Sequence, residues 1–139
     1  MKWDFKNGAP IYQQIVRALR KEIAGGGYPP GSRVPAVREL ALEAGVNPNT
    51  MQRALAELER DGLLETVRTT GKYVTQDREC IGKMRRDLAA ESISGLIGDL
   101  KSLGLSGEEI LDEVKKSLME TGNSDEPVRA HEKKGDTGE

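Results

Sequence analysis

The segment VRELALEAGVNPNTMQRAL, from Val37 to Leu55, determines the fold expected for the rest of the chain. Its apolar and small residues recur at helical spacing, with one interruption at Gly45. Glycine adopts a positive φ without steric cost, so the chain can turn sharply there. Asn47 can cap a second helix through its side-chain oxygen, and Pro48 suits the first helical position because it has no N–H to leave unpaired. The segment therefore predicts a helix-turn-helix, a motif whose second helix enters a DNA groove.

Polar side chains crowd the first turn of this expected second helix. Asn49, Thr50 and Gln52 can exchange hydrogen bonds with base edges, and Arg53 can pair with guanine or with phosphate. The start of a helix also offers backbone N–H groups and the positive end of a dipole to phosphate. The alternative is that these side chains are only solvated polar groups. Together with the capping residue Asn47, they form the candidate DNA-reading set.

The residues before the motif predict an extended arm and an amphipathic helix. In residues 1–9, Trp3 and Phe5 alternate with polar residues and are expected to lay their rings on the domain. Residues 10–24 repeat apolar side chains on one helical face. Tyr12 lies in this helix and is interpreted as a core residue rather than a contact. All aromatic residues lie in the first 73 positions, so the tightest core is expected there.

A β-hairpin is expected directly after the second helix. Residues 64–68 and 72–76 suit strands, and the residues between them suit a turn. A hairpin in this place is the wing of a winged helix, and its tip can reach a minor groove or the phosphates beside it. The alternative is an ordinary hairpin tip. The candidate contacts of this region, with one arginine from the turn before the motif, are Arg33, Thr69, Thr70, Gly71 and Lys72.

The chain changes character from Asp77 onward. Two further helices are expected, the second opened by a capping box of Ser106 and Glu109. So short a helical pair buries too little apolar surface to close a core alone, so we expect it to pair with a second copy. The expected fold class is α+β and mostly helical. Its parts are a winged helix-turn-helix DNA-binding head (1–78), a two-helix dimerisation segment (79–121) and a disordered polar tail (122–139).

A series of short motifs covers most of residues 10–75 in one order. They are Ile11-Tyr12-Gln13-Gln14-Ile15, Leu19-Arg20, Pro30-Gly31-Ser32, Pro35, Arg38-Glu39-Leu40-Ala41, Gly45-Val46, Asn49-Thr50, Leu58, Asp61-Gly62-Leu63 and Gly71-Lys72-Tyr73-Val74. In this order and spacing they resemble the GntR superfamily of bacterial transcription regulators. The resemblance implies that Arg38 reaches DNA at the mouth of the helix-turn-helix. The alternative for Arg38 is a surface ion pair with Glu39 or Glu43.

The short C-terminal part narrows the resemblance to the YtrA-like subgroup. Most GntR members carry a large ligand-binding domain behind the head, and residues 79–121 are too few for one. The resemblance implies that these helices pair subunits and that the regulated operon often encodes an ABC-type transporter. Ala36 and Pro48 stand where many members have serine and arginine, and the tip lacks the common Gly-x-Gly. The operator sequence is therefore not transferable from better-known relatives.

Charge and composition are compatible with a cytoplasmic DNA-binding protein. The net charge is −2, but residues 1–79 carry 12 Lys and Arg against 10 Asp and Glu, whereas residues 80–139 carry 9 against 13. The basic excess thus lies with the expected reading head. No apolar run approaches the roughly 20 residues that span a bilayer, and no signal-peptide pattern is present, so no membrane association is expected. A single cysteine, Cys80, excludes an intramolecular disulfide.

Enzymatic chemistry has little support in the sequence. The only histidine, His131, lies in the polar tail, and Cys80 has no histidine partner. No metal-ligand cluster or phosphate-binding glycine loop stands out, so no cofactor or metal is expected. We expect a sequence-specific regulator, a repressor that binds double-stranded DNA as a homodimer on an inverted-repeat operator. The alternative is a winged-helix protein-interaction module. The sequence leaves open the operator, the regulated genes and whether a small-molecule effector binds.

Overall fold

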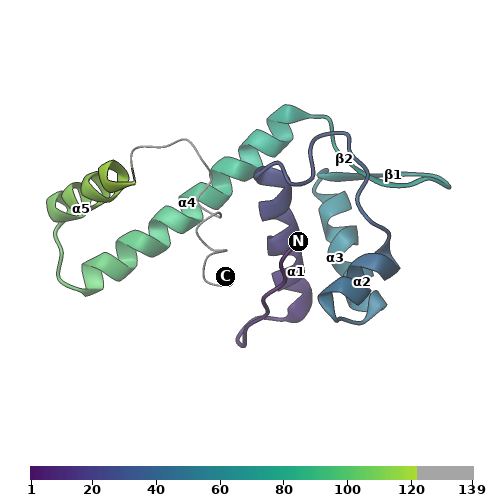
Figure 1. The fold of residues 1–139 in the computed structure, drawn as a ribbon, viewed down its shortest axis with the longest axis horizontal. Coiled ribbons are helices and arrows are strands. Elements are labelled where there is room, and N and C mark those ends of the chain that lie inside the picture. The colour runs from purple at the N-terminus through teal and green to yellow at the C-terminus, as the bar shows by residue number, and fades with distance from the viewer. Residues whose placement is uncertain (122–139) are drawn as a thin grey trace. The chain divides into compact units, whose positions relative to one another are not determined.

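The computed structural model describes residues 1–121, so the expected disordered tail lies outside the described residues. The contacts divide the chain into two units, Met1–Ala89 and Ala90–Glu139. Figure 1 shows the order of the elements along the chain. They are α1 (Ile11–Ala24), α2 (Val37–Ala44), α3 (Pro48–Arg60), β1 (Leu64–Val67), β2 (Gly71–Val74), α4 (Arg78–Ser102) and α5 (Gly107–Glu120).

The core of the first unit lies between α1, α2 and α3, because α3 packs against both other helices (Figure 1). The apolar stripes predicted at helical spacing form this core. Trp3 and Phe5 pack against it from the N-terminal arm, with their ring centroids 6.0 Å apart. The largest fully buried side chains are Ile15, Leu19, Leu40, Met51, Leu55, Leu58 and Val74.

The turn between α2 and α3 has the predicted geometry. Gly45 has a φ of 72° and is left-handed, which is the conformation that favours glycine. The Asn47 side chain caps α3 by accepting a hydrogen bond of 2.7 Å from the backbone N–H of Asn49, and Pro48 is the first helical residue. Local sequence signals thus position the start of α3, which is the part of the motif that matters for DNA.

The hairpin β1–β2 is antiparallel, with Leu64 opposite Val74 and Val67 opposite Gly71. Both strands are shorter than predicted, because the ladder ends at the tip residues on one side and at Val74 on the other. A third segment pairs with β2: the Val34 N–H donates to the Lys72 carbonyl at 2.9 Å. The first unit is therefore a winged helix-turn-helix, and the predicted mostly helical α+β class is confirmed.

The first part of α4 belongs to the head. Ile81 and Met84 are buried in the head core, and the Arg85 Nε donates to the carbonyl oxygen of Ala24 at the end of α1, at 3.1 Å. The sequence pattern ends the head at residue 78, whereas the compact unit continues to Ala89. Helical periodicity alone does not reveal that one helix contributes to two units.

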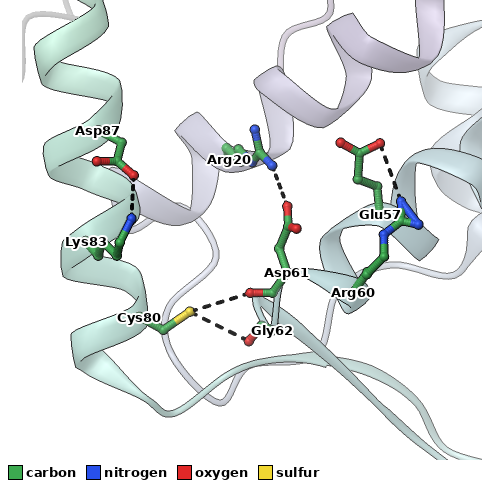
Figure 2. A network of polar contacts seen from close by, with 8 residues as sticks. All are labelled: Arg20, Glu57, Arg60, Asp61, Gly62, Cys80, Lys83 and Asp87. Carbon is green, nitrogen blue, oxygen red and sulfur yellow. Dashed lines mark hydrogen bonds and ion pairs between the residues drawn. The ribbon is translucent and has the colours of Figure 1, made fainter.

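Polar contacts at the end of α3 join it to α1 and to the start of α4 (Figure 2). Arg20 on α1 pairs with Asp61 at the end of α3, at 2.5 Å. The Cys80 Sγ lies 3.9 Å from the carbonyl oxygens of both Asp61 and Gly62. Burial, and then the carboxylates of Asp77 and Asp61, raise the pKa of the Cys80 thiol. Cys80 is therefore a packing residue with little thiolate character.

We expect Cys80 to react slowly with iodoacetamide near pH 8. The thiolate is the nucleophile, and a raised pKa lowers its fraction at that pH relative to an ordinary thiol. The alkylation rate of the folded chain should be below that of the same chain in urea, and should still be rising at a pH where the unfolded chain has levelled off. Equal rates and equal pH profiles in the two states would contradict the assignment.

The second unit contains the rest of α4 and α5. The helix α4 runs unbroken through Gly95 and Gly98, although each glycine costs a helix roughly 1 kcal/mol against alanine. Ser106 and Glu109 form the predicted capping box at the start of α5. Ile110 is buried, but many other apolar side chains of this unit are exposed. Among residues 1–121, no helix combines the length and apolar character that crossing a membrane requires.

Candidate nucleic-acid interface

The first turn of α3 separates apolar from polar side chains. Met51 is fully buried in the head core, whereas Asn49, Gln52 and Arg53 are exposed and Thr50 is half-buried. This separation follows from the 3.6-residue period, since burying one side chain directs its neighbours outward. The predicted reading residues therefore lie on the solvent side of a helix start that is held in place from beneath.

Arg53 lies against an aromatic ring of α1. Its guanidinium carbon is 3.6 Å from the centroid of the Tyr12 ring. Around this pair, the starts of α1 and α3 enclose an open hollow of about 390 Å³, lined by Ile11, Tyr12, Asn49, Thr50 and Arg53. Three of the predicted reading residues are thus brought together in one place.

Arg38 is exposed in the first turn of α2. In the described part of the chain no carboxylate pairs with it, so the expected alternative of an ion pair with Glu39 or Glu43 is not formed. The Glu43 carboxylate instead accepts a hydrogen bond of 3.5 Å from the Trp3 indole N–H. The residue before the helix, Ala36, offers no side-chain cap, so the first N–H groups of α2 have no capping side chain.

The tip of the wing is held by Arg33. Its Nε donates to the Thr70 carbonyl oxygen at 2.8 Å. Gly71 has a φ of 132°, and a Cβ there would lie 2.7 Å from that same nitrogen. Thr69 has a φ of 67°, an unusual conformation for a residue other than glycine. The positive φ therefore favours glycine at position 71, and a Cβ there would also displace the flexible Arg33 side chain from the Thr70 carbonyl.

Lys72 links the wing to α3. Its Nζ lies 3.3 Å from Glu59 Oε1 and 3.0 Å from Thr66 Oγ1, and the Thr66 hydroxyl donates to the other carboxylate oxygen of Glu59. The side chain of Lys72 is only 17% exposed. Its charge is therefore partly neutralised within the head. Lys72 is thus less available to a phosphate than the exposed Arg33 and Arg38.

A second hollow, of about 280 Å³, lies between the wing and the start of α2. The predicted contacts Arg33, Thr69, Gly71 and Lys72 line it, together with the backbone segment that leads into α2. Arg38 and Gln52 line neither hollow, and the Asn47 oxygen is engaged in capping α3. Thr70, at the wing tip, also lines neither hollow. The hollows thus bring together seven of the eleven predicted residues in two groups, one at the start of α3 and one at the wing. No cluster of potential metal ligands occurs among residues 1–121.

Comparison with known proteins identifies the family. The model of the gntR family of bacterial regulatory proteins matches residues 11–74. The HTH-type transcriptional regulator YhcF of Bacillus subtilis is 38% identical over 116 residues, which cover 80% of this chain and 92% of YhcF. The chain belongs to the GntR family. This GntR protein is therefore a DNA-binding transcription regulator of the helix-turn-helix type, and not an enzyme.

Two further relatives show how far the similarity extends along this GntR chain. The HTH-type transcriptional repressor YtrA of Bacillus subtilis is 34% identical, over 81% of this chain and 88% of YtrA. The solved structure of a GntR family transcriptional regulator from Listeria monocytogenes is 43% identical, covers 81% of this chain and 98% of that one, and superposes with a TM-score of 0.74. The resemblance to the short YtrA-like members is thus confirmed beyond the head.

Sequence reasoning missed two features of this GntR head. Tyr12 was assigned to the core, yet its ring is half-buried and lies under Arg53. The acidic run Glu57-x-Glu59-x-Asp61 reads as a solvated helix face in the sequence, whereas Glu59 pairs with Lys72 and Asp61 with Arg20, and Thr66 also binds Lys72. No local signal reveals either feature, because each depends on how α3 crosses another element.

Proposed function

We propose that this protein is a homodimeric repressor that binds an inverted-repeat operator. The observation that carries the proposal is the exposed polar start of α3, which is capped, supported by a buried core and flanked by a wing. The relative YtrA is named a transcriptional repressor, which supports repression rather than activation for this protein. The family resemblance further suggests an ABC-type transporter operon as the target and the bacterial cytoplasm as the location.

The case for a dimer rests on exposed apolar residues in the second unit. Ile93, Leu96 and Ile97 are 55%, 45% and 37% exposed and fall on one face of α4, at positions i, i+3 and i+4. On α5, Leu111 and Leu118 are exposed and two turns apart. Contiguous exposed apolar surface of this kind marks an interaction site. A two-fold dimer presents two reading heads and therefore requires an operator with two-fold symmetry.

The proposed DNA contacts lie at the start of α3, at the start of α2 and at the wing. Asn49, Thr50 and Gln52 read base edges, while Arg38, beside the uncapped start of α2, contacts phosphate or guanine. The wing enters or borders the minor groove, with the tip shaped by Arg33 and anchored through Lys72. Asn47 contributes by fixing the start of α3. The full proposed set is Arg33, Arg38, Asn47, Asn49, Thr50, Gln52, Arg53, Thr69, Thr70, Gly71 and Lys72.

A gel-shift assay with the DNA upstream of the protein's own gene tests this function. Saturable binding that resists excess random-sequence competitor is the expected result. Binding should also weaken steeply with salt, because lysine and arginine displace counterions from phosphates. Binding that competitor removes completely, on this DNA and on a genome-wide fragment library, would instead favour the protein-interaction module.

Arg38→Ala and Gln52→Ala are each expected to weaken operator binding by about 1–3 kcal/mol if they contact bases. Arg60→Ala is the matched control: Arg60 lies at the other end of α3, is 70% exposed on its side chain and pairs only loosely with Glu57, at 3.8 Å. Fluorescence anisotropy with a labelled operator measures all three. Unchanged affinity in both test variants, with folding intact by circular dichroism, would contradict the proposed reading face.

A further inference from the structure

The pair formed by Tyr12 and Arg53 joins two helices at the reading face. Tyr12 lies in the first turn of α1 and Arg53 in the second turn of α3. The distance of 3.6 Å between the guanidinium carbon and the ring centroid is well inside the roughly 6 Å limit for cation–π attraction. In the described residues no carboxylate pairs with Arg53, so the ring is the group that fixes this cation.

The ring is itself held in place. Tyr12 is half-buried on α1, one turn before the buried Ile15 and Val16, and its phenol oxygen accepts a hydrogen bond of 3.4 Å from Gln13 Nε2. A guanidinium that lies on a fixed ring loses less rotamer freedom when it later binds an acceptor. Its N–H groups lie in its own plane, so stacking leaves them available for bidentate binding at the rim of the ring.

The surroundings of the pair indicate the acceptor. Asn49 and Thr50 line the same hollow as Arg53, so the cation lies beside the residues proposed to read bases. The hollow also includes Ile11 and Tyr12 of α1, a helix outside the helix-turn-helix. Arg53 lies in the second turn of α3, over a ring of α1, whereas Asn49 and Thr50 lie in the first turn. A reading helix places its N-terminal residues at base edges, so a cation further along it and to one side is expected beside the phosphates that border the groove. A backbone phosphate is therefore the acceptor that this geometry favours over a base edge.

We propose that Tyr12 is a positioning residue that holds Arg53 against a DNA phosphate beside the bases contacted by Asn49 and Thr50. The proposal rests on DNA binding by the face described above. It does not require the specific operator, because a phosphate contact is present on any duplex. The phosphate contact can therefore be tested on random-sequence DNA, even if the protein shows no preference for an operator.

A double-mutant cycle tests the pair, with Tyr12→Leu, Arg53→Gln and the double variant measured on the operator and on a random-sequence duplex. Arg53→Gln should weaken binding by about tenfold or more on both duplexes, as expected for a hydrogen-bonded charge. Tyr12→Leu should weaken it by about 2- to 5-fold, the size of an exposed cation–π interaction. In the Arg53→Gln background, Tyr12→Leu should have no further effect.

Two readouts separate positioning from a purely structural role. Tyr12→Phe keeps the ring and should bind within about twofold of wild type, whereas a role of the hydroxyl would make it as weak as Tyr12→Leu. Arg53→Gln should also reduce the slope of log K against log salt by about 1, because one phosphate contact is lost. If the slope is unchanged, or if Arg53→Gln weakens binding only to operators with one particular base pair, then Arg53 binds a base and the proposed phosphate contact is wrong. Equal effects of Tyr12→Leu with and without Arg53 would overturn the pairing itself.

Discussion

Replacing Ile93 and Ile97 together by glutamate is expected to convert the protein from a dimer to a monomer. Both side chains are exposed on one face of α4, and four carboxylates would face one another in a two-fold interface. Affinity for an inverted-repeat operator should then fall by about 10²–10⁴-fold, because each head binds its half-site alone and the gain from linking two heads is lost. Affinity for a single half-site should change little.

Sedimentation equilibrium gives the oligomeric state, and anisotropy on full-site and half-site duplexes gives the two affinities. The control is Leu42→Glu, which places one glutamate, half of the charge added in the test variant, on a leucine of α2 that is 85% exposed in the head. It should leave the oligomeric state unchanged. If the Ile93→Glu, Ile97→Glu variant remains a dimer with unchanged helicity, the α4 face is not the interface and the proposal for this surface is wrong.

Local signals explain why the helix-turn-helix was predictable. The left-handed Gly45, the Asn47 cap and Pro48 at the first position of α3 each depend on the backbone within a few residues. Sequence patterns report such constraints directly. The exposed reading residues follow from the same periodicity, because the buried Met51 fixes which side of α3 faces solvent.

Burial in α4 was not predictable in the same way. Ile81 and Met84 are buried, whereas Ile93 and Ile97 are exposed in this chain, although all four are apolar and belong to one helix. Periodicity indicates a helix, but the partner of each turn is set by tertiary contacts. The extension of the head to Ala89 is a consequence of those contacts.

The environments of the two wing cations, Arg33 and Lys72, were also not predictable from the sequence. Arg33 reaches the Thr70 carbonyl across 37 positions of the chain, and Lys72 reaches Glu59 on α3. As isolated residues in a polar loop and a strand, both cations look equally available to phosphate. Only the crossing of the wing over α3 distinguishes the half-buried Lys72 from the exposed Arg33.

Leu55→Ala is expected to lower the free energy of unfolding of the head by about 2–5 kcal/mol. Leu55 is 1% exposed and lies on α3, the helix that packs against both α1 and α2. Truncating it removes apolar contacts within the head core and leaves a cavity there. Operator binding should fail at temperatures where wild type still binds, because the reading residues share this helix.

The sole tryptophan makes the measurement specific to the head. Trp3 packs against the head core, so its fluorescence during urea unfolding reports on this unit rather than on α5. Leu42→Ala is the control, since it deletes the same atoms from a leucine that is 85% exposed and should change stability by no more than about 0.5 kcal/mol. Both variants are compared at one fixed chain concentration, because dimerisation adds to apparent stability. Equal losses from Leu55→Ala and Leu42→Ala would mean that α3 is not the central element of the core. The position of the reading residues would then depend on something other than the packing beneath them.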